Sequence, residues 1–156
     1  MNFIFKPSLT IITVVLFFVN ISCSKESDNT ENELPNADQY ITWNIDGNKG
    51  ALTSPVDSLA SARYATDTHI AGASKNNQNE IYFIFKGNRE NGTYRITYSQ
   101  IYINGSGFSA FSNSLQAIVK TYGNVGDYIT GSYFGNVTDS TSKAMTIRGD
   151  FKLKTR

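Results

Sequence analysis

The chain has 156 residues, enough for one domain and too few for two of ordinary size. Its 14 basic and 13 acidic side chains leave a net charge of +1, without the basic excess typical of nucleic-acid-binding proteins. The single Cys excludes an intrachain disulfide and any zinc site with several Cys ligands, and the single His excludes metal sites with several His ligands. Ten Phe, nine Tyr and one Trp favour a β-rich fold.

Residues 1–22 are predicted to be a secretory signal peptide. Lys6 supplies a positive charge, and the apolar stretch 9–19 is too short to cross about 30 Å of hydrocarbon as a helix. The sequence Asn20-Ile21-Ser22-Cys23 then resembles the lipobox of bacterial lipoproteins. The resemblance implies that Cys23 becomes the first mature residue, with a diacyl group on its sulfur and an acyl chain such as palmitate on its amine. The alternative is an ordinary signal peptide cut elsewhere, which leaves a free thiol.

Residues 23–38 are predicted to be the lipidated Cys followed by a flexible acidic tether. Residues 24–38 carry one Lys against five acidic side chains, and Leu34 is their one large apolar residue, so they cannot bury enough surface to order themselves. The charged run 24–28 resembles the surface-export signal of lipoproteins in the Bacteroidota. It implies an outer-membrane protein at the cell surface rather than on the periplasmic face; the alternative is a solubilising linker.

Residues 39–156 are predicted to be an all-β domain, an antiparallel β-sandwich or alternatively a small β-barrel, with seven to nine short strands. Apolar residues recur at every second position in most of the domain, and Asp46-Gly47-Asn48 is a turn signal. The expected strands cover 41–45, 81–85, 94–98 with a continuation to 103, 115–122, 128–137 and 145–153.

Two segments are harder to assign. In 55–73, residues 59–62 suit a helical turn, whereas 63–73 suits one or two strands. Residues 105–114 suit a loop of small residues, in which Phe108 and Phe111 are expected to pin the loop to the core; the alternative is that they present a contact surface.

The last strand shows the clearest alternation, with Asp150 predicted to face outward and ionised between Arg148 and Lys152. The domain holds 12 basic and 8 acidic residues, an excess that we expect to be spread over a solvated surface.

The domain resembles a family of small uncharacterised lipoproteins from the Bacteroidota. The similarity lies in the opening strand and turn 41–47, the Asn91-Gly92-Thr93-Tyr94 element, the glycine-containing strand 128–135 and the closing strand 145–153. It implies a single β-sandwich domain, and the family has no assigned catalytic residues to transfer.

No catalytic, cofactor or metal site is predicted. His69 lies two residues from Asp67, but no nucleophile is placed beside them, and nothing selects a pair of carboxylates for glycoside hydrolysis. Residues 46–50 resemble the start of a calcium loop, yet the twelfth-position glutamate is missing, so a hairpin turn is favoured.

Aromatic residues give the sharpest binding hypothesis. Trp43 shares a strand face with Ile41 and Ile45 and is predicted to lie in the core, whereas Tyr82, Tyr102 and Tyr122 alternate with apolar neighbours and are candidate ligand contacts. Ser58 and Ser140 lie in Asp-Ser-Leu and Asp-Ser-Thr triplets that match an O-glycosylation motif, both in expected loops.

Together these patterns predict a non-enzymatic binding or accessory module held on the outer membrane through Cys23. The alternatives are a surface glycan-binding module, or a structural partner of an outer-membrane barrel or secretion assembly. A hydrolase fits least well.

Overall fold

The structure is a computed structural model that describes residues 35–87, 89–110 and 114–156. The predicted signal peptide, Cys23 and most of the tether lie outside the described residues, as does Phe111. Ten strands are described: β1 (Tyr40–Ile45), β2 (Asn48–Thr53), β3 (Ser58–Tyr64), β4 (Asp67–Ala73), β5 (Glu80–Lys86), β6 (Gly92–Ile103), β7 (Ser106–Ala110), β8 (Gln116–Tyr122), β9 (Tyr128–Thr138) and β10 (Ala144–Lys154).

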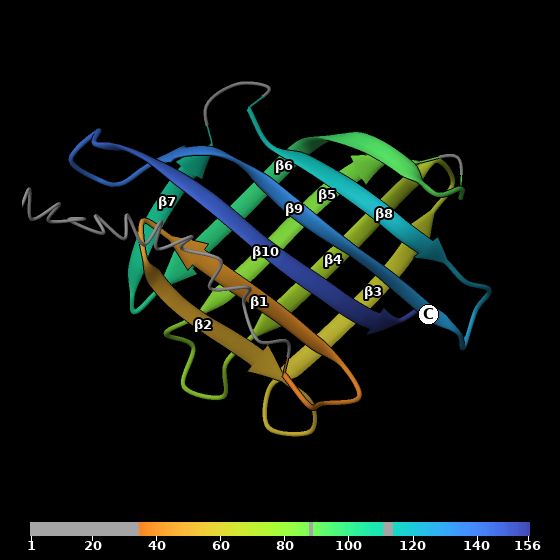
Figure 1. Ribbon diagram of the computed structural model, residues 1–156. Helices are drawn as coiled ribbons and strands as arrows, with labels where there is room; N and C mark the ends of the chain where they lie inside the picture. The colour runs from red at the N-terminus through yellow and green to blue at the C-terminus, as the bar shows by residue number, and fades with distance from the viewer. Residues whose placement is uncertain (1–34, 88, 111–113) are drawn as a thin grey trace, which may run out of the picture. The chain divides into compact units, whose positions relative to one another are not determined.

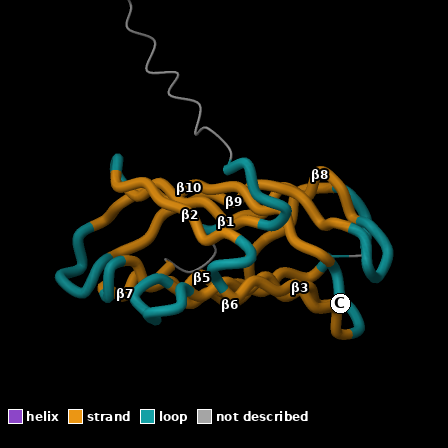
Figure 2. Tube along the Cα trace, turned by 90° about the horizontal axis from the view of Figure 1, so that it is seen from below, coloured by secondary structure: helices purple, strands orange, loops and turns teal. Residues whose placement is uncertain are grey.

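The predicted all-β antiparallel fold is confirmed for the described residues. Every pairing between named strands is antiparallel, in the order β2-β1-β10-β9-β7-β6-β5-β4-β3, with β8 paired to β6 and β9. This ladder bends over on itself to make two layers (Figures 1 and 2). The first layer holds β1, β2, β8, β9 and β10, and the second holds β3, β4, β5 and β7. The long strand β6 pairs with β8 at one end and with β5 and β7 at the other.

The core lies between the layers and is built from inward side chains at every second position. Phe83 of β5 has its ring centroid 5.1 Å from that of Tyr133 in β9 and 5.9 Å from that of Phe151 in β10, so these three rings join the layers. Trp43 is 5% exposed, which confirms its predicted place in the core. Phe108 packs partly buried against the same core, as expected for the residue predicted to pin its segment.

The first layer contains an unusual crossing at Gly149. Tyr133 pairs with Gly149 across the β9–β10 ladder, and its hydroxyl donates a 2.7 Å hydrogen bond to the Thr42 carbonyl in β1, one strand further on. The Thr42 hydroxyl in turn accepts the Asp150 N–H at 2.8 Å. A methyl group at Gly149 would lie 2.0 Å from the Thr42 carbonyl oxygen. Glycine is therefore required there, because only a residue without a side chain lets the tyrosine reach β1.

The hairpin interpretation of Asp46-Gly47 is confirmed. Asp46 (φ 45°) and Gly47 (φ 90°) both have positive φ, which is the conformation of a two-residue turn between antiparallel strands, here β1 and β2. Asp46 also accepts the Thr146 N–H at 3.2 Å. Its carboxylate thus joins the hairpin to the start of β10.

The structure assigns most of the two segments that the sequence left uncertain. Residues 58–73 form the two strands β3 and β4, so the helical turn is wrong, and residues 106–110 form strand β7 rather than a loop. The described residues contain no helix with the length and apolarity needed to cross a membrane.

Candidate functional site

The outward surface of the second layer is made from tyrosines standing among small residues. The strand register places Ala62, His69, Ile84 and Tyr98 in one row across β3 to β6, and Ala60, Ala71, Tyr82 and Gln100 in the next. We call this surface the tyrosine face, meaning the outward side chains of β3, β4 and β5 and of residues 98–102 in β6. The alanines keep its floor low, so the aromatic rings stand above it.

Four aromatic rings form a continuous stripe across this face. Tyr64 and His69 have ring centroids 4.8 Å apart, His69 and Tyr82 5.9 Å, and Tyr82 and Tyr98 5.8 Å. Neighbouring rings are tilted by 58° to 69°, in the edge-to-face range that aromatic pairs prefer. The two end members are open to solvent, Tyr64 at 62% and Tyr98 at 52% exposure.

Polar groups are held in place along the stripe. The His69 Nδ1 and the Tyr82 hydroxyl lie 2.8 Å apart in a hydrogen bond. Partial burial, followed by the neighbouring Tyr98 and Tyr64, raises the pKa of Tyr82 above its ordinary value. The Tyr82 side chain therefore stays protonated in the physiological range and keeps a hydroxyl that can both donate and accept. Beside it, Gln100 donates to a Glu80 carboxylate oxygen at 3.4 Å.

Two open hollows adjoin the stripe. One, of about 720 Å³, is lined by Tyr98, Gln100, Tyr102 and the facing strand β7. The other, of about 510 Å³, is lined by Ala60, Ala71, Tyr82 and the loop 54–57. Both are wide surface depressions rather than closed cavities, and their linings mix aromatic, amide and carboxylate groups. Such a surface suits an extended ligand with both apolar and hydroxyl-bearing faces.

Two of the three predicted contact tyrosines lie on the tyrosine face. Tyr82 lies within the stripe, and Tyr102 is 41% exposed beside it and packs over Gly107. Tyr122 does not lie there. A β-bulge between Val119 and Thr121 shifts the register of β8 by one residue, so Tyr122 pairs with buried Ile129 and packs against the core. There it contacts the Arg63 guanidinium at 4.5 Å and shares a hydrogen bond with Thr68.

The sequence interpretation missed Tyr64 and Tyr98. The alternation of residues 94–98 predicts that Tyr98 shares a face with Tyr94 and Ile96. The β5–β6 register instead shifts at Ile84 and Phe85, and Thr97 becomes the extra residue, so Ile96 stays inside while Tyr98 turns outward. The change of parity between Ile96 and Ile101 was the one signal of this bulge in the sequence.

The remaining candidate residues are not members of the stripe, although Ser140 lines the larger hollow beside it and Ser58 lines the smaller one. Ser140 is exposed in the β9–β10 turn, as expected, whereas exposed Ser58 is the first residue of β3 rather than part of a loop. Asp67 shares the outward face with His69, but its carboxylate accepts a 3.4 Å hydrogen bond from the Thr66 hydroxyl. Within the described residues no group of three or more His, Cys, Asp or Glu side chains is placed to hold a metal ion.

The opposite outer surface differs in kind. We call it the cationic face: the outward side chains of the first layer, with those of residues 93–95 in β6. Its charged residues, including those at its margin, are the basic Lys49, Arg95, Lys120, Arg148, Lys152 and Lys154 and the acidic Asp38, Asp46 and Asp150. The expectation that the positive excess is spread over the surface is therefore wrong, because the strand pairing gathers it on one side.

Asp150 lies half-buried on the cationic face. Burial raises the pKa of its carboxyl above the ordinary value, and the nearby Lys120 ammonium offsets this only in part. Asp150 lies on the outward face, as predicted, but the expected effect of flanking Arg148 and Lys152 is corrected in direction, because the pKa is raised rather than lowered. Loss of solvation outweighs the attraction of the basic neighbours.

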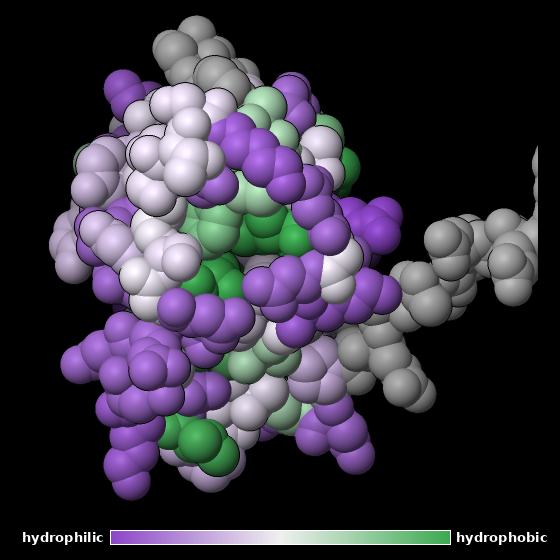
Figure 3. Space-filling view, turned by 90° about the vertical axis from the view of Figure 1, so that its left-hand side faces the viewer, coloured by the Kyte–Doolittle hydropathy of each residue, from purple (hydrophilic) through white to green (hydrophobic). Residues whose placement is uncertain are grey.

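Figure 3 shows the end of the molecule that lies on the left of Figure 1, where apolar surface lies in a hollow surrounded by polar side chains. At this end partly buried Met145 packs against the core, and Asp46, Asn136 and Thr146 line a depression of about 320 Å³ beside it.

A scan against protein-family models gives no match to the chain, and a search of the curated proteins gives none either.

Proposed function

We propose that this chain is a non-enzymatic binding module, anchored to the bacterial outer membrane through lipid on Cys23, and that the tyrosine face takes up its ligand. The single observation that carries the binding role is the stripe of Tyr64, His69, Tyr82 and Tyr98. Four aromatic side chains from four neighbouring strands occupy the outward face, where a solvated sheet normally carries charged and small polar residues.

A glycan is the ligand class that this chemistry favours. The C–H face of a sugar ring packs on an aromatic side chain, and its hydroxyls need donors and acceptors beside that ring. Tyr82 and Tyr98 supply rings and hydroxyls, while Gln100 and Glu80 supply an amide and a carboxylate within the same rows. The face holds few charges, so a neutral or weakly charged glycan suits it better than a strongly acidic or basic ligand.

A glycan array with the full chain tests the ligand class, followed by titration calorimetry on the sugars that bind. Tyr82→Ala and Tyr98→Ala should each weaken binding at least about fivefold, the effect of removing a well-placed aromatic contact. Phe134→Ala is the matched control, since Phe134 is 40% exposed on the cationic face and its loss should leave affinity unchanged. Absence of binding to any sugar at millimolar concentration would count against a glycan ligand.

The anchor is tested separately in cells. Cys23→Ala should move the protein from the membrane fraction to the soluble fraction, because two or three acyl chains hold a protein stably on a bilayer. If the variant stays in the membrane fraction after removal of residues 1–22, which mass spectrometry checks, lipidation of Cys23 is not what holds the protein there. Protease treatment of intact and lysed cells then distinguishes the cell surface from the periplasmic face.

A further inference from the structure

The cationic face carries the whole positive excess of the described chain. Residues 35–156 hold 12 basic and 9 acidic side chains; six basic and three acidic ones belong to this face and its margin, and six of each lie elsewhere. The face is therefore net positive, and the rest of the domain is neutral. Only the strand pairing brings these residues together, since Lys49, Lys120 and Arg148 come from three different strands.

The cations on this face are largely free to meet a partner. Lys49, Lys120, Arg148 and Lys154 are exposed, and Lys152 lies half-buried with its ammonium 4.8 Å from the Tyr128 ring centre. Among the described residues the one ion pair is Lys154 with Asp38, at 3.5 Å between Nζ and Oδ2. The other five basic side chains have no such carboxylate partner in the part of the chain that the structure describes.

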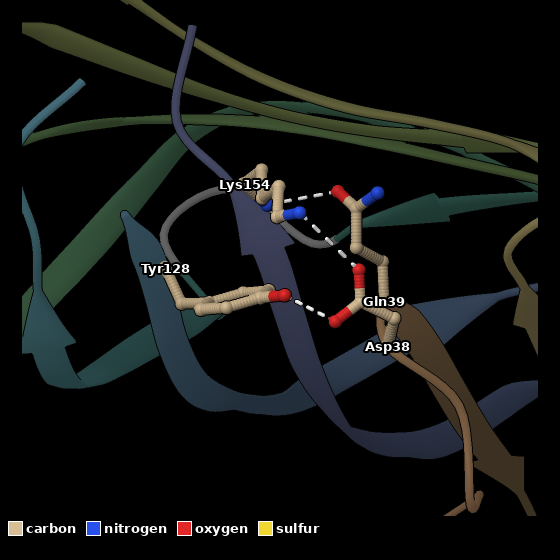
Figure 4. Close-up of polar contacts among 4 residues, drawn as sticks. All are labelled: Asp38, Gln39, Tyr128 and Lys154. Carbon is tan, nitrogen blue, oxygen red and sulfur yellow. Dashed lines mark hydrogen bonds and ion pairs between the residues drawn. The ribbon is translucent and has the colours of Figure 1, made fainter. Parts of the chain in front are cut away.

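The chain also enters the domain on this face. Asp38 accepts a hydrogen bond from the Tyr128 hydroxyl and pairs with Lys154, both of which point outward from the first layer (Figure 4). Gln39 accepts the Lys154 N–H at 2.8 Å. The segment leading to Cys23 thus starts from the cationic side of the domain and not from the tyrosine face, and residues 24–38 reach at most about 50 Å.

We propose that the cationic face lies on the phosphate-bearing surface of the membrane that holds the lipid anchor. The inference rests on the proposed anchor at Cys23 and adds the contact that orients the domain. The exposed basic side chains of this layer complement a plane of anionic lipid headgroups, and the chain that leads to the anchor enters the domain on the same side, at Asp38. The tyrosine face, on the opposite layer, then points away from the membrane toward its ligand.

Attraction of this kind acts over a short range. The Debye length is about 8 Å at physiological ionic strength, so exposed cations matter only once the domain is close to the surface. A tether with a reach of about 50 Å keeps the domain close enough to meet the surface repeatedly, and the cations then act on contact. Each basic side chain near an anionic surface then changes the partition coefficient by about fivefold.

Vesicle sedimentation with residues 23–156 carrying Cys23→Ser, and so without the apolar segment 9–19 and without acyl chains, tests the contact. The probes are vesicles of phosphatidylethanolamine with phosphatidylglycerol, and neutral vesicles of phosphatidylcholine. We expect binding to the anionic vesicles alone, lost in 1 M salt, where the Debye length is about 3 Å. Combined Lys49→Gln, Lys120→Gln, Arg148→Gln and Lys152→Gln should lower the partition coefficient by on the order of a hundredfold or more.

The matched control removes the same charge from elsewhere on the domain. Lys75, Lys86, Arg89 and Arg156 are exposed outside the cationic face, and their change to Gln should lower the partition coefficient far less. Equal losses in the two variants would overturn the proposal, because net charge alone would then explain the binding. Binding of soluble dextran sulfate through this face without vesicle binding would also overturn it, in favour of an acidic polysaccharide partner.

A second measurement does not depend on a fourfold variant. A fluorophore on Gln116→Cys, on the cationic face, should be quenched by spin-labelled headgroups in anionic vesicles, whereas one on Lys86→Cys, on the tyrosine face, should not. Equal quenching at both positions would contradict the orientation. Neither experiment requires lipidation or a glycan, so failure of the anchor or of the ligand class is seen separately from failure of this contact.

Discussion

The two outer faces of the sandwich share one strand pattern and differ in what that pattern exposes. In both layers every second residue enters a common core, where Phe83 from one side meets Tyr133 and Phe151 from the other. Outward, one layer shows lysines and arginines around Asp150, and the other shows tyrosines, a histidine and alanines. The inward side chains of both layers must pack into the same core and are therefore similar. The outward side chains are free to differ, and they show what each side of the domain contacts.

The layers also differ in how glycine serves them. The inward position of Gly149, in the cationic layer, is filled by the Tyr133 ring and faces the Thr42 carbonyl. For Gly72, in the tyrosine layer, the three nearest atoms are the methyl ends of Leu52, Ile41 and Leu59. The backbone of a paired strand cannot move aside to admit a methyl group, whereas the methyl ends of side chains can. The first layer is therefore the less tolerant of added volume.

Among the variants that test this difference between the layers, we expect Gly149→Ala to lower stability the most. The added methyl would lie 2.0 Å from the Thr42 oxygen and 2.7 Å from the Tyr133 ring, and we expect a loss of about 3 kcal/mol or more, up to failure to fold. Gly72→Ala should cost less, because its three neighbours at 2.8 to 2.9 Å are side-chain ends. Urea denaturation measures both, with Gly92→Ala, whose nearest neighbour is 3.4 Å away, as the inert control.

The next effect concerns the hydroxyl that crosses Gly149. Tyr133→Phe keeps the ring but leaves the buried Thr42 carbonyl without its 2.7 Å partner, which should cost about 1–3 kcal/mol. Tyr102→Phe removes an exposed hydroxyl from the tyrosine face and should change stability by less than about 0.5 kcal/mol. Equal losses by thermal denaturation in the two variants would show that the crossing hydrogen bond contributes nothing special.

A smaller effect is expected from pH at Asp150. Because its pKa is raised in the folded state, its ionisation opposes folding, and this loss of stability sets in as pH rises through the folded pKa. Asp150→Asn should therefore stabilise the domain at pH 7 by less than about 1 kcal/mol, since the group is half exposed and screened, and the gain should vanish below about pH 3.8. It should also tighten vesicle binding, because it leaves the cationic face more positive.

Asp139, in the β9–β10 turn, gives the opposite sign for comparison. The Thr141 hydroxyl, followed by the Lys143 N–H, lowers the pKa of its carboxyl, so its contribution to stability is present at neutral pH and is lost as pH falls through that lowered pKa. Asp139→Asn should destabilise the domain slightly at pH 7. Chemical denaturation at pH 7 and at a pH below 3.8 measures the stability of both variants. A change of stability at pH 7 with the same sign in Asp150→Asn and Asp139→Asn would contradict this electrostatic account.

The smallest effect is expected at the point where the chain enters. Asp38→Ala removes the Tyr128 and Lys154 contacts, both at the surface, and should leave the unfolding temperature unchanged. Its visible result should be faster hydrogen exchange of the amides of residues 37–39 alone. A uniform change across β9 and β10 would show instead that Asp38 stabilises the sheet.

The sequence predicted side-chain orientation correctly where strand pairing is uninterrupted and incorrectly where a strand carries a bulge. The β9–β10 ladder pairs 11 residues of each strand without interruption, and the predicted alternation of residues 145–153 is correct throughout. The strands β6 and β8 each carry a bulge. There the same reasoning put Tyr98 on the face of Ile96 and made Tyr122 an exposed candidate, whereas Tyr98 is exposed and Tyr122 packs against the core. Bulges depend on how a strand divides its pairing between partners, and β6 pairs with three of them.

The two candidate surfaces illustrate the same limit. Tyr82 and Tyr102 could be selected because each alternates with apolar residues inside one strand. The stripe as a whole could not be predicted from the sequence, because Tyr64 and His69 meet only through the pairing of β3 with β4. The cationic face was missed for the same reason: its lysines are far apart in the chain, and only the order of the strands makes them neighbours.

Under the proposed anchoring through Cys23, the attachment at Asp38 has a consequence for many copies on one membrane. A domain that is free to tumble on its tether presents its ligand-binding surface in all directions, whereas one fastened beside the face that contacts the bilayer presents it outward in every copy. With the proposed glycan site on each copy, an array of such copies becomes multivalent toward a polymer with repeating sugars. Simultaneous engagement can raise the overall avidity by about 10²–10⁴ over one site without any new contact. Weak binding by each single tyrosine stripe is then sufficient for firm capture of a long chain.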